Sequence, residues 1–194
     1  MMLGKQAKIL SPAQIKAVIR YLECSRWPER NIVIFLLSVR AGLRAKEIAS
    51  ITWDMVTDAE GNLRDCIALA DSATKGTSGG IIPMANELQN ALRALQISSN
   101  PSSFENRIIR TSRSKQTSSQ VIINMFRQWY SGLGLAGCSS HSGRRTFITR
   151  AAKNIGRFGG SLRDVQALAR HRSLAMTQRY IEIDTEAMRK VVDV

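Results

Sequence analysis

The stretch HSGRRTFITRAAKNIG, residues 141–156, brings a histidine and two arginines to the predicted start of a helix. The chain has two histidines, and no acidic residue accompanies His141, Arg144 and Arg145. Residues three apart share a helix face, so His141 and Arg144 are predicted to point together, whereas Arg145 lies about 100° away. The helix start also directs its positive dipole end at any bound anion. A solvated basic face is the simple interpretation, and the surrounding sequence supports a more specific one.

Positive charge is concentrated around this helix. Residues 141–180 contain nine arginines and lysines and a single acid, Asp164. This segment therefore supplies +8 of the net charge of +13. A basic surface of this kind predicts a polyanionic partner. Membrane binding would need a bulky apolar face with more aromatic residues than Phe147, Phe158 and Tyr180. Nucleic acid is therefore favoured, and a generic RNA-binding domain would explain the charge alone.

Other bulk features exclude several classes of protein. The three cysteines are odd in number and widely spaced, which indicates neither a disulfide framework nor a zinc site. The longest apolar run, IVIFLL from Ile32, is too short to span a bilayer, and the N-terminus lacks the apolar core of a signal peptide. We expect a cytoplasmic, nucleoid-associated protein without a metal, a cofactor or a membrane partner.

Turn and cap signals predict a mainly α fold with a small antiparallel β-sheet, an α+β class. Ser11 and Pro12 mark the first helix start, and Gly42 ends the second helix. Two apolar segments, 65–71 and 79–84, flank a turn-rich stretch and predict a β-hairpin. A short strand is expected at 107–111. Helices are predicted over residues 12–23, 28–40, 44–53, 86–97, 119–131, 142–155, 162–170 and 174–183, with a last short one within 185–192.

Five places could carry chemistry, and each also has a structural interpretation. Arg44 with Glu47 one turn later could be a surface ion pair. Lys75 could be a solvated turn lysine, and either His141 or His171 could be a helix-end residue without a function. Tyr180 could simply pack against its neighbours.

Taken together and in order, these places resemble the tyrosine recombinase, or phage integrase, family over about residues 8–185. The matching motifs are Gly42-Leu43-Arg44 with Glu47, Thr74-Lys75-Gly76, His141 with Arg144, His171 in LARHRS, and Thr177 with Tyr180. Three departures are Ala169 where glycine is usual before the second histidine, Gly143 inside a helix start, and a hairpin segment SGGIIPM that lacks a basic residue.

The resemblance implies a DNA breaking–rejoining fold and a site-specific recombinase that needs no metal. Tyr180 would attack a DNA phosphodiester and form a 3′-phosphotyrosine. Arg44, supported by Glu47, and Arg144 would bind the nonbridging oxygens. The family roles of the remaining residues make Lys75 the general acid for the leaving oxygen, His141 the acid–base partner of the tyrosine, and His171 a hydrogen-bond donor to the phosphate.

The resemblance also predicts partners and domain organisation. Further DNA contacts are expected from Lys115, Arg113, Arg172 and Arg179, with Arg145 contacting flanking phosphate or forming an internal ion pair. We expect a single catalytic domain over residues 1–194, without the family's usual N-terminal core-binding domain. A tail at 184–194 would be exchanged between protomers that are monomeric when free and tetrameric on double-stranded DNA, with accessory DNA-bending proteins. The alternative for the tail is that it folds back on its own core. The alternatives are a type IB topoisomerase-like enzyme and a non-catalytic DNA-binding regulator.

Overall fold

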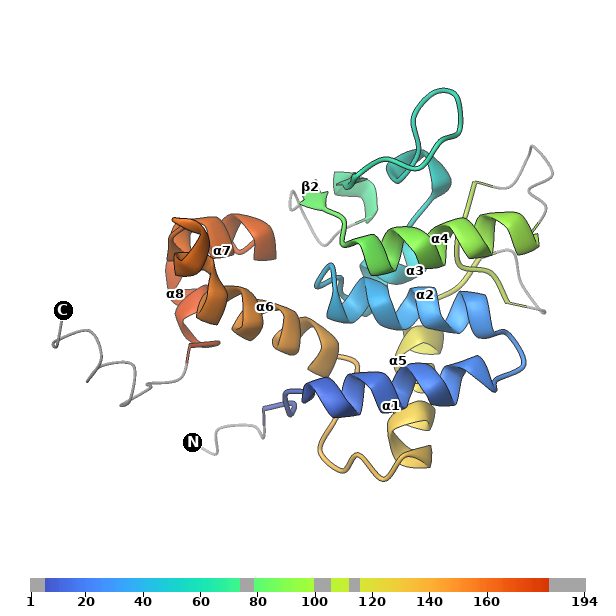
Figure 1. The fold of residues 1–194 in the computed structure, drawn as a ribbon, viewed down its shortest axis with the longest axis horizontal. Coiled ribbons are helices and arrows are strands. Elements are labelled where there is room, and N and C mark those ends of the chain that lie inside the picture. The colour runs from blue at the N-terminus through green and yellow to red at the C-terminus, as the bar shows by residue number, and fades with distance from the viewer. Residues whose placement is uncertain (1–5, 74–78, 100–105, 112–115, 182–194) are drawn as a thin grey trace, which may run out of the picture. The chain divides into compact units, whose positions relative to one another are not determined.

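The computed structural model describes residues 6–73, 79–99, 106–111 and 116–181 (Figure 1). The chain divides into two compact units, Met1–Phe147 and Ile148–Val194. The first unit contains α1 (Pro12–Glu23), α2 (Pro28–Val39), α3 (Ala45–Ser50), η1 (Trp53–Met55), β1 (Cys66–Leu69), η2 (Asp71–Ala73), β2 (Gly80–Pro83), α4 (Asn86–Ser99) and α5 (Ser119–Gly132). The second contains η3 (Ile155–Phe158), α7 (Leu162–Ala169) and α8 (Leu174–Gln178), and the boundary falls within α6 (Ser142–Asn154).

Helix α1 begins where its cap residues predict. The Ser11 side chain accepts a hydrogen bond from the Gln14 amide, the Gln14 side chain accepts one from the Ser11 amide, and Pro12 occupies the first turn. This reciprocal capping satisfies amide groups that have no partner within the helix. One apolar stripe of α1 is buried, which fixes its inner face.

Helix α2 is the centre of the first unit, between α1 and α4 (Figure 1). From Val33 to Val39 every residue is buried, as expected for a helix that is apolar on all sides. The helix ends because Gly42 adopts a left-handed conformation with φ +64°, which lets the Leu43 amide donate back to the Leu37 carbonyl. The turn Gly42–Arg44 is therefore fixed to the most deeply buried helix.

The predicted hairpin is present as an antiparallel pair. Cys66 pairs with Pro83, and Leu69 pairs with Gly80. The fold is thus mainly helical with one small antiparallel sheet, as predicted.

Three of the predicted elements differ from the structure. The helix predicted over 44–53 ends at Ser50, because Ile51 is extended, and η1 follows separately from Trp53. At 107–111 the described residues form an isolated bridge between Arg107 and Thr52 rather than a strand, because η1 begins directly after Thr52 and turns the partner segment away. Helix α8 ends at Gln178, five residues before the predicted end. There the Tyr180 amide donates to Thr177 in a tight turn, and the Tyr180 carbonyl accepts from the Thr149 hydroxyl instead of continuing the helix.

Candidate active site

The first candidate group lies at the Gly42–Arg44 turn, where α3 begins. The Arg44 amide donates to Glu47 Oε2 at 2.7 Å, and its guanidinium donates to Glu47 Oε1 at 2.8 Å. Glu47 is 1% exposed, whereas about a third of the Arg44 side chain remains accessible. A buried carboxylate thus fixes the base of a partly exposed guanidinium, as the spacing predicts.

Arg144 reaches the same turn from a distant part of the sequence. It lies in the first turn of α6, is 4% exposed, and donates a hydrogen bond from Nη1 to the Gly42 carbonyl across 102 sequence positions. The structure therefore brings Arg44 and Arg144 to one three-residue turn, Gly42–Arg44, which we call the arginine turn. The sequence predicted that both would serve one site but contained no sign of this hydrogen bond.

Two glycines allow this close approach. A Cβ at Gly42 would lie 2.5 Å from the Phe147 ring, and a Cβ at Gly143 would lie 2.3 Å from Ser38 Oγ in α2. Real side chains essentially never approach so closely. Gly143, which seemed unusual at a helix start, is explained by the packing of α6 against α2.

His141 and Arg145 flank Arg144 in different environments. His141 is exposed directly before α6, and its carbonyl accepts the hydrogen bond from the Arg145 amide that opens the helix. Arg145 Nη1 donates to the Ala7 carbonyl at 3.0 Å, while the Thr146 hydroxyl accepts from the Leu10 amide. These two contacts join the segment before α1 to α6, so Arg145 has an internal role, and its contact with DNA stays a prediction.

The second unit brings His171, Thr177 and Tyr180 together. Thr177 Oγ1 lies 3.0 Å from His171 Nδ1, and the His171 and Tyr180 rings stack with centroids 5.4 Å apart at 28°. Thr149 in α6 donates to the Tyr180 carbonyl at 3.1 Å. Sequence reasoning missed Thr149, although a β-branched hydroxyl residue on the Thr146–Thr149 face of a helix is a detectable signal.

The residue before His171 that adopts a glycine-like backbone conformation is not the one that the sequence indicated. The left-handed residue is Arg170, with φ +53°, and not Ala169, which is the last residue of α7. Glycine would therefore be favoured at Arg170, directly before the histidine. The left-handed position is thus one residue after Ala169, where the sequence predicted a departure from glycine.

Some predicted residues take no part in the described geometry. Lys75, Arg113, Lys115 and the tail at 184–194 lie outside the described residues. Arg172 and Arg179 are exposed in the second unit. The one acid of the basic segment, Asp164, caps α7, and hydrogen bonds from the Ser161 amide and hydroxyl hold its pKa below the ordinary value.

The two other tyrosines of the chain differ in accessibility. Tyr130 is 2% exposed, and its buried hydroxyl has no hydrogen-bond partner among the described residues. Burial raises the pKa of Tyr130 well above its usual value. Tyr21 is accessible on α1. A buried phenol of this kind cannot reach a substrate, so Tyr130 is a poor candidate for a nucleophile.

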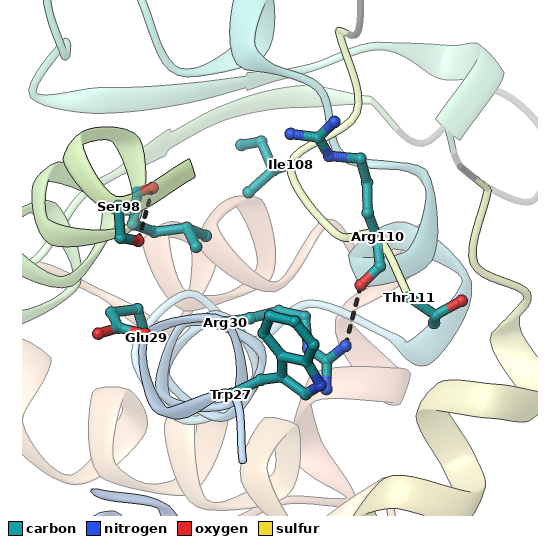
Figure 2. A pocket seen from close by; sticks show the side chains of 8 residues that line it. Trp27, Glu29, Arg30, Ser98, Ile108, Arg110 and Thr111 are labelled. Carbon is teal, nitrogen blue, oxygen red and sulfur yellow. Dashed lines mark hydrogen bonds between the residues drawn. The ribbon is translucent and has the colours of Figure 1, made fainter. Parts of the chain in front are cut away.

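A pocket of about 330 Å³ lies near the start of α2, away from the arginine turn at Gly42–Arg44 (Figure 2). The Trp27 indole and the Arg30 guanidinium line it, and Arg30 donates to the Arg110 carbonyl at 3.0 Å. Helix α2 is about 18 Å long at 1.5 Å per residue, which separates this pocket from the arginine turn. None of the described candidate residues lines it.

The described part of the chain holds no cluster of three or more His, Cys, Asp or Glu side chains that could bind a metal ion. Within the same ranges, every helix is too short or too polar to cross a bilayer.

Comparison with known proteins agrees with these motifs. The tyrosine recombinase XerC of Brucella suis biovar 1 (strain 1330) is 26% identical over 168 residues, which cover 84% of this chain and 50% of that protein. The chain thus spans about half the length of the curated relatives it matches.

Solved structures show the same fold. The crystal structure of XerA recombinase matches with a TM-score of 0.73 at 22% identity, over 95% of this chain and 63% of that chain. The Tn1549 transposon integrase in complex with a circular intermediate DNA matches with a TM-score of 0.74 at 17% identity, over 98% and 67%. The phage integrase family model matches residues 8–187, and the chain belongs to this family.

Proposed function

We propose that this chain cuts and rejoins double-stranded DNA as a site-specific recombinase, through a 3′-phosphotyrosine on Tyr180. The observation that carries the proposal is the meeting of Arg44 and Arg144 at the Gly42–Arg44 turn. Two guanidiniums held at one turn are suited to a single phosphate group, because each is permanently charged and presents donors in a planar fork.

The reaction is a transesterification. The Tyr180 oxygen attacks the scissile phosphorus and forms a phosphotyrosine ester, while the bond from phosphorus to the 5′-oxygen breaks. The arginines stabilise the negative charge on the nonbridging oxygens of the phosphorane. The 5′-oxygen leaves with a proton, which we assign to Lys75. Attack by a 5′-hydroxyl reverses these steps, so religation needs no external energy source.

The histidines have separate assignments. His141, exposed at the start of α6, exchanges the proton of the Tyr180 hydroxyl. His171 donates a hydrogen bond to the phosphate. The family match and the DNA-bound state of the Tn1549 integrase support the choice of DNA as substrate.

We also propose that the chain acts in the cytoplasm, with the nucleoid. Exposed arginines such as Arg172 and Arg179 would contact phosphates beside the cut, so binding should weaken steeply with salt. The free chain would be monomeric and would form a tetramer on DNA through its 184–194 tail, assisted by accessory DNA-bending proteins. The domain assignment of residues 1–194 as one catalytic domain stays a prediction.

The test is the Tyr180→Phe substitution, which removes one oxygen and little packing. Duplex DNA that carries recombination sites from the gene's flanks, nicked so that religation is blocked, is incubated with the protein and analysed in SDS. We expect the wild type and the matched Tyr21→Phe control to form an SDS-resistant adduct. Tyr180→Phe should bind the same DNA without forming it.

Each other outcome contradicts a part of the proposal. An adduct with Tyr180→Phe would exclude Tyr180 as the nucleophile. Binding without any adduct by the wild type would favour a non-catalytic regulator. Relaxation of supercoils by a monomer, without strand exchange between two sites, would favour a topoisomerase.

A further inference from the structure

Thr177 occupies an unusual position for a helical hydroxyl residue. Its side chain is 0% exposed, and Oγ1 lies 3.0 Å from His171 Nδ1, six residues earlier in the chain. A buried hydroxyl is costly without a hydrogen-bond partner, so this contact stabilises the packing of α8. It also selects which ring nitrogen of His171 faces inward.

The rest of His171 is fixed as well. The His171 amide donates to the Gln166 carbonyl at 3.0 Å, and Gln166 Nε2 donates to the His171 carbonyl at 3.0 Å. The amide and the carbonyl of His171 are thus both held, and the hydrogen bond at Nδ1 contributes to the orientation of the imidazole. The face of that ring supports the Tyr180 phenol, which stacks on it.

The hydrogen bond has a chemical consequence. In a neutral imidazole one nitrogen carries the proton and the other accepts. If Thr177 donates to Nδ1, the proton must lie on Nε2. Nε2 is then the hydrogen-bond donor of the ring, and Nδ1 is the acceptor.

We infer that Thr177 is a positioning residue, whose hydroxyl donates to His171 Nδ1, keeps the imidazole proton on Nε2 and orients the ring that supports Tyr180. The role toward phosphate rests on the proposed function, because it assigns the Nε2 proton to the scissile phosphate. Thr177 itself would not touch DNA. The hydrogen bond at Nδ1 can be measured without DNA.

The first experiment observes the imidazole directly by ¹⁵N NMR on the 194-residue chain labelled at histidine. The chain has only two histidines, so a His141→Gln variant assigns both. At a pH where the ring is neutral, we expect His171 to show a protonated Nε2 and a hydrogen-bonded, unprotonated Nδ1. Thr177→Val should move the Nδ1 resonance toward that of a nitrogen without a hydrogen bond, and Thr177→Ser should not.

The second experiment measures the rate of adduct formation on the nicked DNA substrate. Loss of a buried hydrogen-bond partner slows a step that depends on it by about tenfold to a hundredfold, and we expect this of Thr177→Val. Thr177→Ser keeps the hydroxyl and should restore most of the rate. Gln178→Ala, an exposed neighbour in α8, is the control that should keep the wild-type rate.

The outcomes separate the inference from the proposed function. A protonated Nδ1 in the wild type, or an Nδ1 resonance unchanged in Thr177→Val, overturns the inference whatever the activity. Equal slowing by the Val and Ser variants also overturns it, because the methyl packing would then matter and not the hydroxyl. If the wild type forms no adduct, the proposed function fails while the NMR result still decides how Thr177 acts on His171.

Discussion

The two arginines and the histidine–tyrosine pair are held by different means. Arg44 and Arg144 meet at a turn that ends a helix buried continuously from Val33 to Val39. In Ile148–Val194 the buried apolar residues, among those described, are Ile148, Val165 and Ala169. There, hydroxyl groups hold the candidate nucleophile and its neighbour.

This difference indicates how readily each group can move. A turn fixed to a large apolar core is displaced only with much of that core, because packed interiors resist small changes in volume. A helix of five residues held by hydrogen bonds, each contributing about 1 kcal/mol, can open locally at a much smaller free-energy cost. We therefore expect the arginines to be rigid in the free protein and α8 to be adjustable.

The largest expected effect comes from breaking the arginine turn with Gly42→Ala. The new Cβ would force a left-handed alanine and would collide with Phe147. Strain and overpacking together should lower the free energy of unfolding by about 3 kcal/mol. Urea denaturation checks this.

A matched control separates the two causes. Gly134 has nearly the same φ, +65°, but a Cβ there meets nothing within 4 Å. Gly134→Ala should therefore cost only about 1 kcal/mol, the strain alone. Equal losses from the two variants would show that the turn is not tightly packed and would weaken the contrast between the two units.

A smaller effect is expected at Arg170 in the second unit. Because its φ is +53°, Arg170→Gly should be more stable than Arg170→Ala by about 1 kcal/mol. At Ala167, an exposed residue within α7, the order should reverse, with Ala167→Gly less stable than the wild-type alanine by about 1 kcal/mol. Hydrogen exchange of the α7 and α8 amides measures both pairs. The same order at both positions would contradict a left-handed Arg170.

The smallest effect at neutral pH is expected from Tyr130→Phe, which removes a buried hydroxyl without a partner among the described residues. Stability should change by less than about 1 kcal/mol at pH 7.5. Burial raises the pKa of Tyr130, so the unfolded chain ionises first once the pH exceeds about 10. The wild type should then lose stability relative to Tyr130→Phe as pH rises. Urea midpoints at about pH 7.5 and 10.5 measure this difference, and a pH-independent difference would show that the phenol ionises equally in both states.

Local signals in the sequence predicted most of the fold. The Ser11–Gln14 cap, the break at Gly42 and the two apolar strands all lie within a few residues of the elements they define, and the structure has these elements. The end of α8 could not be predicted, because the hydrogen bond from Thr149 to the Tyr180 carbonyl joins residues 31 apart.

The candidate site likewise combines contacts that local spacing predicts with contacts that it does not predict. The Arg44–Glu47 pair was predicted because the two residues are one helical turn apart. The hydrogen bond from Arg144 to Gly42 and the close packing of Gly143 on Ser38 depend on tertiary contacts that no local pattern encodes.

The ion pair at the arginine turn has a further consequence for charge balance. Two guanidiniums and the Glu47 carboxylate leave one net positive charge, which equals and opposes the single negative charge of a phosphodiester. The turn would thus neutralise the DNA in its ground state. A phosphorane formed by a phenolate carries a second negative charge, and catalysis requires interactions that strengthen only as that charge develops. The net charge of the turn balances one of the two negative charges of the phosphorane, so stabilisation of the second would fall to Lys75 and the two histidines.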